Sequence, residues 1–230
     1  MMFTIRSGSM TAVIDSVGAQ LMSLQSVDGT QYLWQGDPKY WPDRSLTIFP
    51  YVARLTDGCY RYRGELYHMP IHGFAPTAEF SVAEQTDAAI TFVLESCPAF
   101  YEQYPFLFRY SIRYRLENAT LHVEITVENK DEKTMHFGLG GHPGINVPLE
   151  EGLRFEDYVR EVPPCQPRRM EFTPACFITG RELPFPMECN QLPLSHHMFD
   201  EDAIVLKGIP GEVTLKSSKG HRGVTLMAPD

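Results

Sequence analysis

Two histidines with glycine neighbours are the residues of this chain best suited to proton transfer. His72 lies in the segment PIHGFA (70–75), and His142 lies in the segment FGLGGHPGIN (137–146). Histidine is the side chain that most readily exchanges a proton near neutral pH, and glycine lets a ligand approach the main chain closely. Either histidine alone is more often structural, but two such segments, each after a strand-like run, favour a functional pair. Their spacing does not name a reaction.

Arg54 is the third residue that invites a chemical interpretation. It lies in the segment LTIFPYVARL (46–55), which is otherwise apolar except for Thr47. A guanidinium within such a run must be paired or face a polar cavity, because burying its charge unpaired is costly. Two interpretations stay open: a structural ion pair, or a hydrogen-bonding fork for a polar ligand such as a sugar.

Other kinds of active site lack support in the sequence. The remaining histidines do not follow a zinc-ligand pattern on a helix, so no metal ion is expected. No glycine-rich phosphate loop and no Gly-x-Ser-x-Gly elbow occurs. An odd number of widely spaced cysteines favours reduced thiols in a cytoplasmic protein. The five are Cys59, Cys97, Cys165, Cys176 and Cys189.

Short strands must position these segments, because alternation of apolar and polar residues dominates the chain. Turns every ~8–12 residues are typical of an all-β sandwich or barrel. The one helical signal covers residues 98–104, and the proline-rich stretch 163–193 predicts irregular structure. The main predicted strands cover residues 10–17, 20–26, 59–63, 65–69, 80–84, 89–95, 106–116, 121–128, 212–216 and 224–227.

The composition bounds the partners of the protein. The chain has 230 residues and a formal net charge of −9, which argues against nucleic-acid binding because such proteins need a basic surface. No apolar run approaches the ~18 residues of a membrane-spanning helix, and the N-terminus does not resemble a secretory signal. We therefore expect a cytoplasmic protein with a small-molecule ligand and no membrane partner.

Three segments together resemble the aldose 1-epimerase family, whose members are galactose mutarotase-like. They are IFPYVARLTDG (48–58), PIHGFA (70–75) and GGHPGINVPL (140–149), and the closest similarity is to the bacterial branch found in lactose operons. The resemblance runs from about Ala12 to Asp230. It implies a large antiparallel β-sandwich with little helix and a sugar groove. It also implies interconversion of the α and β anomers of a hexose by acid–base ring opening, without a cofactor.

The resemblance implies a role for each candidate residue. His142 would be the acid at the ring oxygen, His72 would hydrogen-bond and orient the sugar, and Arg54 would hold hydroxyl groups. Asp202 matches an aspartate that binds sugar hydroxyls, although an exposed acidic turn explains it equally well.

Two departures from the family pattern affect the site. Pro76 stands where the family usually has an arginine, whose contacts are either lost or supplied by Arg44 or Arg109. The family's general base is a glutamate beyond the position that matches Asp230. We therefore expect a single galactose mutarotase-like domain over residues 1–230 without its C-terminal strands. The base would lie beyond Asp230, and the chain could form a homodimer. Alternative functions are a non-catalytic carbohydrate-binding protein or a hexose-6-phosphate 1-epimerase.

Overall fold

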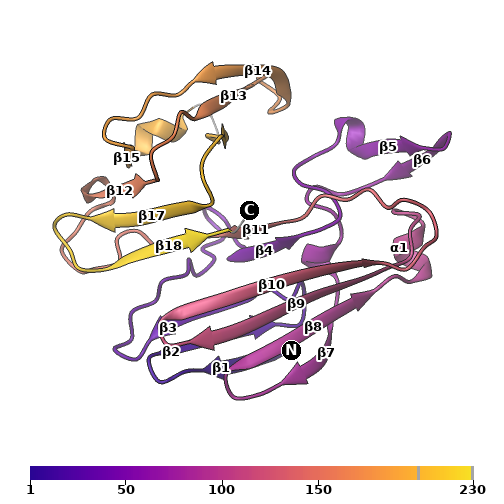
Figure 1. Ribbon diagram of the computed structural model, residues 1–230, viewed down its shortest axis with the longest axis horizontal. Coiled ribbons are helices and arrows are strands. Elements are labelled where there is room, and N and C mark those ends of the chain that lie inside the picture. The colour runs from indigo at the N-terminus through magenta and orange to yellow at the C-terminus, as the bar shows by residue number, and fades with distance from the viewer. Residues whose placement is uncertain (201–202, 229–230) are drawn as a thin grey trace. The chain divides into compact units, whose positions relative to one another are not determined.

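A computed structural model describes residues 1–200 and 203–228 of the chain (Figure 1). The chain divides into two compact units, Met1–Asn146 and Val147–Asp230, and each is described by itself. The paired strands of both units are antiparallel. Among the described residues, the single α-helix is the short α1 (Pro98–Tyr101). The predicted all-β, antiparallel class is confirmed, whereas the single domain over 1–230 stays a prediction. In the described part of the chain, no helix has the length and apolar character to cross a membrane.

The first unit contains two sheets that pack face to face through β1, β2, β8 and β9 (Figure 1). Their strand orders are β1-β2-β3 and β10-β9-β8-β7. Apart from β1, the strands of these two sheets were predicted and are confirmed with small shifts at their ends. Their bounds are β1 (Met2–Arg6), β2 (Met10–Asp15), β3 (Leu21–Ser26), β7 (Ser81–Gln85), β8 (Ala89–Glu95), β9 (Phe108–Glu117) and β10 (Thr120–Asn129).

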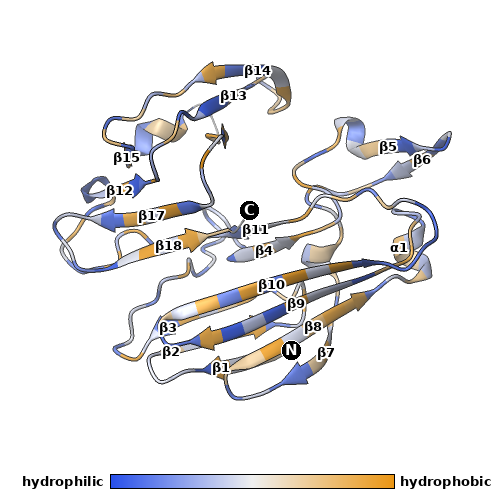
Figure 2. Ribbon diagram, viewed as in Figure 1, coloured by the Kyte–Doolittle hydropathy of each residue, from blue (hydrophilic) through white to orange (hydrophobic). Residues whose placement is uncertain are grey.

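Strand β9 shows why the four-stranded sheet forms. Successive side chains of a strand point to opposite faces, and residues of β9 are alternately buried and partly exposed from Phe108 to Leu116. The arginines of the exposed face pair with carboxylates, as Arg109 does with Glu95 at 3.1 Å. Figure 2 shows the same alternation as changes between hydrophobic and hydrophilic colour along β9 and β10.

An aromatic cluster around Phe49 fills the core beneath the histidine segments. The Phe49 ring is fully buried and stacks on Tyr110, with ring centroids 4.5 Å apart. Edge contacts to Phe74, Tyr104 and Phe108 surround it at 6.0, 6.0 and 5.2 Å. These offset and edge geometries are the favoured ones for aromatic pairs. The packing fixes the segment that leads from β4 toward the candidate site.

The first unit also contains two small sheets, one of which carries His142. Strand β4 (Ser45–Ile48) pairs with β11 (Gly140–Pro143), and His142 lies opposite Leu46. The predicted hairpin around Gly64 is confirmed as β5 (Cys59–Tyr62) and β6 (Glu65–His68). Strand β11 contains two glycines and one proline, so no apolar alternation marked it in the sequence.

The second unit corrects the prediction of irregular structure over residues 163–193. That stretch contains β13 (Arg168–Phe172), β14 (Ile178–Pro184) and β15 (Gln191–Pro193). Its prolines lie between strands or end β14 and β15, which are both edge strands, and proline is tolerated at such positions. The sheets run β15-β12-β17-β18 and β14-β13-β16. The other strands are β12 (Tyr158–Glu161), β16 (Leu206–Lys207), β17 (Glu212–Ser217) and β18 (Gly223–Met227).

Candidate active site

Two hydrogen bonds to Ala53 hold His72 in a left-handed backbone conformation. The φ angle of His72 is 66°. Its N–H donates to the carbonyl of Ala53 at 2.9 Å, and the N–H of Ala53 donates to Nδ1 of His72 at 3.2 Å. The next residue must be glycine: Gly73 has φ of 78°, and an added Cβ would lie 2.2 Å from the carbonyl oxygen of Phe49. The local geometry therefore fixes both the main chain and the ring of His72.

The contact with Ala53 selects the tautomer of His72. Because Nδ1 accepts a hydrogen bond, it carries no proton in the neutral ring, and the proton sits on Nε2. Partial burial lowers the pKa of His72, and the nearby His142 and Arg54 lower it further. Desolvation and like charges both disfavour the protonated imidazole. Near neutral pH, His72 thus offers a single Nε2–H donor on the side of the ring away from Ala53.

His142 lies beside His72 although 70 positions separate them in the sequence. The two ring centroids are 5.8 Å apart and the rings meet edge to face. His142 is held by the pairing of β11 with β4, and it is exposed to solvent. The structure thus brings the two glycine-flanked histidines into one site, where one ring is fixed as a donor and the other is open to a ligand.

Arg54 belongs to the same site but not in the way expected. The premise that its guanidinium is buried is wrong: Arg54 is exposed, because the chain leaves the core after Pro50. No desolvation penalty therefore demands an ion pair. Its charge lies close enough to contribute to the lowered pKa of His72. Arg54 can reach hydroxyl groups of a ligand near that ring.

The arginines considered as replacements at Pro76 have other contacts. Pro76 lies in a short 3₁₀ helix, Ala75–Thr77, and its carbonyl packs against Gly18. Arg109 pairs with Glu95 and Glu128 on the exposed face of β9. Arg44 donates from Nη1 to the carbonyl of Met22 at 2.7 Å and to Gln35. Both guanidinium groups therefore have partners other than the histidine pair.

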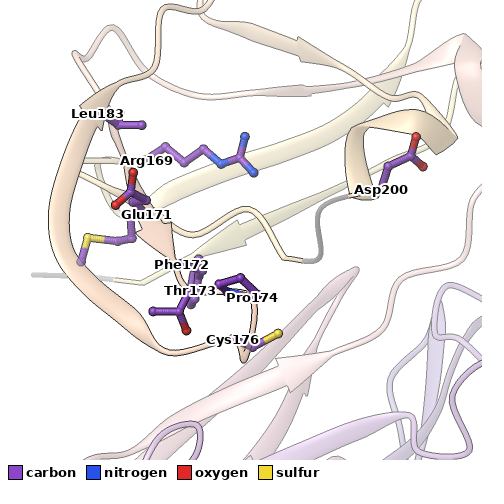
Figure 3. A pocket seen from close by; sticks show the side chains of 9 residues that line it. Arg169, Glu171, Phe172, Thr173, Pro174, Cys176, Leu183 and Asp200 are labelled. Carbon is purple, nitrogen blue, oxygen red and sulfur yellow. The ribbon is translucent and has the colours of Figure 1, made fainter.

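Asp202 lies outside the described residues, so its predicted role stays a prediction. Its neighbour Asp200 lines a cavity of about 680 Å³ within the second unit. Asp200 directly follows the 3₁₀ helix His196–Phe199. Figure 3 shows it across the cavity from Arg169 of β13. The cavity also contains Glu171, Thr173 and Cys176. The lining combines charged side chains with apolar ones such as Phe172 and Leu183.

Trp41 is a component of the site that the sequence reasoning missed. Its ring centroid lies 4.9 Å from that of His142, on a tilt of 51°. His142 therefore has an aromatic neighbour in Trp41 as well as in His72. No sequence pattern marked Trp41, because it lies in an irregular connection between β3 and β4. It reaches His142 only through tertiary packing.

The histidine pair has no carboxylate partner within residues 1–200 and 203–228. No aspartate or glutamate of this part forms a hydrogen bond or ion pair with either imidazole. Several carboxylates elsewhere pair with lysine or arginine, as Glu182 does with Lys207 at 2.6 Å. The described site supplies a fixed donor, a second imidazole and a nearby cation.

The lowered pKa of His72 predicts a pH-dependent stability. As the pH falls, the imidazole of His72 takes up a proton near its ordinary pKa of 6.5 in the unfolded chain. In the folded chain it does so only at a lower pH. The free energy of unfolding therefore falls as pH drops below 6.5, and the fall continues until the folded ring is also protonated. Urea denaturation at pH 8 and at pH 5 measures this effect. Between the two pH values, the free energy of unfolding should fall more for the wild type than for His72→Gln. Parallel losses in the two proteins would contradict the assignment.

Comparisons with known proteins match this architecture. A sequence profile of the aldose 1-epimerase family matches residues 1–180. The plasmid-encoded LacX protein of Lactococcus lactis subsp. lactis is 31% identical over 237 residues, which cover 97% of this chain and 78% of LacX. The crystal structure of a galactose mutarotase related enzyme from Lactobacillus acidophilus has a TM-score of 0.92 at 31% identity, covering 98% of this chain and 76% of that one. A galactose mutarotase-like protein from Lactobacillus casei ATCC 334 has a TM-score of 0.91 at 32% identity, covering 98% and 78%.

Proposed function

Because this chain belongs to the aldose 1-epimerase family and has its galactose mutarotase-like fold, we propose that it interconverts the α and β anomers of a hexose. The resemblance noted in the sequence is confirmed by these matches. The observation that carries the proposal is the pair His72 and His142, with ring centroids 5.8 Å apart. One ring is a fixed neutral donor, and the other is exposed and open to a sugar.

The proposed reaction moves one proton onto the sugar and removes another. His142 gives a proton to the ring oxygen as the bond between that oxygen and the anomeric carbon breaks. A base removes the proton of the anomeric hydroxyl, and an open-chain aldehyde results. Rotation about the bond from C1 to C2 presents the other face of the carbonyl, and the reverse transfers close the ring as the other anomer. His72 donates from Nε2 to a sugar hydroxyl, and Arg54 binds a second one.

The proposal sets the size of the expected acceleration. His142 supplies the acid of this reaction. A single positioned acid contributes about 10²–10⁴-fold to a rate. We expect His142 to contribute an acceleration of mutarotation within that range.

Polarimetry of freshly dissolved α-D-galactose and α-D-glucose tests the proposal. The protein should speed the change in optical rotation above buffer and above the same concentration of free imidazole. Glucose 6-phosphate in a parallel assay separates a hexose from a hexose-phosphate preference. Rates equal to the imidazole control for all three substrates would refute the enzymatic proposal.

A non-catalytic carbohydrate-binding protein is the second candidate. The observation that favours it is the lack of a carboxylate contact to either imidazole among the described residues. Such a protein would bind galactose in a saturable isotherm while optical rotation changes at the control rate. An isotherm accompanied by acceleration would exclude it.

A further inference from the structure

Both polar main-chain groups of Trp41 form hydrogen bonds. Its N–H donates to the carbonyl of Asp37 at 2.9 Å, which closes a turn. Its own carbonyl accepts from the indole N–H of Trp34 at 2.8 Å. These two bonds fix the main chain of Trp41 although the residue lies outside any strand.

The strand that carries His142 brings Trp41 next to that ring. Gly144 follows directly after β11, two positions beyond His142. An added Cβ on Gly144 would lie 2.9 Å from Cζ3 of Trp41 and 2.9 Å from Cβ of Trp34. Glycine at this position therefore lets the indole lie against the main chain. The Trp41 and His142 rings are then 4.9 Å apart.

The indole is only partly covered by these contacts. Trp41 is partly buried and His142 is exposed, so ring surface beside the imidazole stays open to a ligand. The face of an indole is electron-rich, and the C–H groups of a pyranose carry partial positive charge because oxygen is bonded to each carbon. An aromatic face next to a proton donor can therefore hold a sugar ring while its oxygen points at the donor.

We propose that Trp41 is a sugar-binding residue, the surface on which the pyranose ring stacks beside His142. This inference rests on the proposed function and identifies the ligand as the cyclic form of an aldose. The stacking orients the ring oxygen toward His142 and excludes water from one face of the sugar. Trp41 acts mainly in binding, because the indole has no proton to exchange in the reaction.

The chain contains two tryptophans, which makes a direct spectroscopic test possible. Wild-type protein labelled with 5-fluorotryptophan gives two fluorine resonances, and Trp34→Phe and Trp41→Phe assign them. Galactose should shift the Trp41 resonance saturably and move the Trp34 resonance less. Glycerol at the same osmolality should leave both in place, because it offers hydroxyl groups without a ring.

Substitutions separate stacking from a structural role. Trp41→Ala should weaken galactose binding about 5- to 10-fold, the range expected for losing an aromatic contact, and raise KM with kcat within about 2-fold. Trp41→Phe should recover most of the affinity, because it keeps an aromatic face. Tyr40→Ala is a matched control, since Tyr40 is the adjacent aromatic residue and is 70% exposed. It should bind as the wild type does.

The outcomes distinguish this inference from the proposed function. A shifted Trp41 resonance without faster mutarotation would support stacking and refute the enzyme. Faster mutarotation with an unshifted Trp41 resonance and full affinity in Trp41→Ala would overturn the inference and leave the enzyme standing. Absence of galactose binding in saturation-transfer NMR would overturn both.

Discussion

Replacing His142 with asparagine is expected to remove most of the acceleration of mutarotation, about 10²–10⁴-fold. Asparagine fills a similar volume and can still form hydrogen bonds, but it cannot deliver a proton to the ring oxygen of the sugar. Because His142 is exposed and its strand is held by main-chain pairing with β4, the fold should tolerate the change. Polarimetry of His142→Asn beside the wild type measures the effect.

His122→Asn is the matched control for this prediction. His122 is partly exposed on β10 and lies 3.4 Å from Glu117. It lies opposite Arg115, which belongs to the exposed face of β9. It should keep the wild-type rate. Galactose should still bind to His142→Asn, since Trp41, His72 and Arg54 remain. A rate for His142→Asn equal to that of the wild type would show that another group supplies the proton.

Phe49→Ala is expected to give the largest loss of stability, about 3–5 kcal/mol. The ring is fully buried and contacts four aromatic neighbours besides the partly exposed Phe137. Alanine would leave a cavity that rigid rings cannot collapse to fill. The carbonyl of Phe49 also accepts the N–H of Ala75 at 3.1 Å, so the His72 segment should loosen with the core.

Urea denaturation followed by circular dichroism measures this loss. Phe137→Ala is the control, because that ring is 46% exposed and should cost about 1 kcal/mol or less. If the two variants lose equal stability, the core does not depend on Phe49 as described. Weaker galactose binding by Phe49→Ala under native conditions would show that packing around Phe49 holds the His72 segment in its binding geometry.

The long strands could be predicted because their pattern is local. Strands β9 and β10 alternate over ten residues each, and burial of one face explains that pattern without knowledge of the partner strand. The hairpins around Gly64 and Asn118 follow from turn chemistry next to such runs. Here sequence and structure agree to within two residues.

Other elements could not be predicted because distant partners determine them. Strand β11 is four residues long with two glycines, and only its pairing with β4 makes it a strand. The strands between residues 163 and 193 are separated by prolines that suggested irregular structure. These prolines lie where a main-chain donor is not needed, a fact visible only in the sheet order.

The candidate site was predictable in part for a similar reason. Glycine neighbours marked both histidines. Gly73 is required by its positive φ, and Gly144 by the close approach of Trp34 and Trp41. The hydrogen bond from Ala53 that selects the tautomer of His72 depends on two loops meeting, as does the contact of Trp41 with His142. Arg54 suggested burial only because its segment is apolar, although the chain has already left the core there.

The confinement of the histidine pair to one compact unit has an evolutionary consequence. Trp41, Arg54, His72 and His142 all lie within Met1–Asn146, held by β4, β11 and the Phe49 cluster. Contacts within Met1–Asn146 therefore determine the spacing between the two imidazoles. Selection on that spacing should act on the part of the gene that encodes these residues.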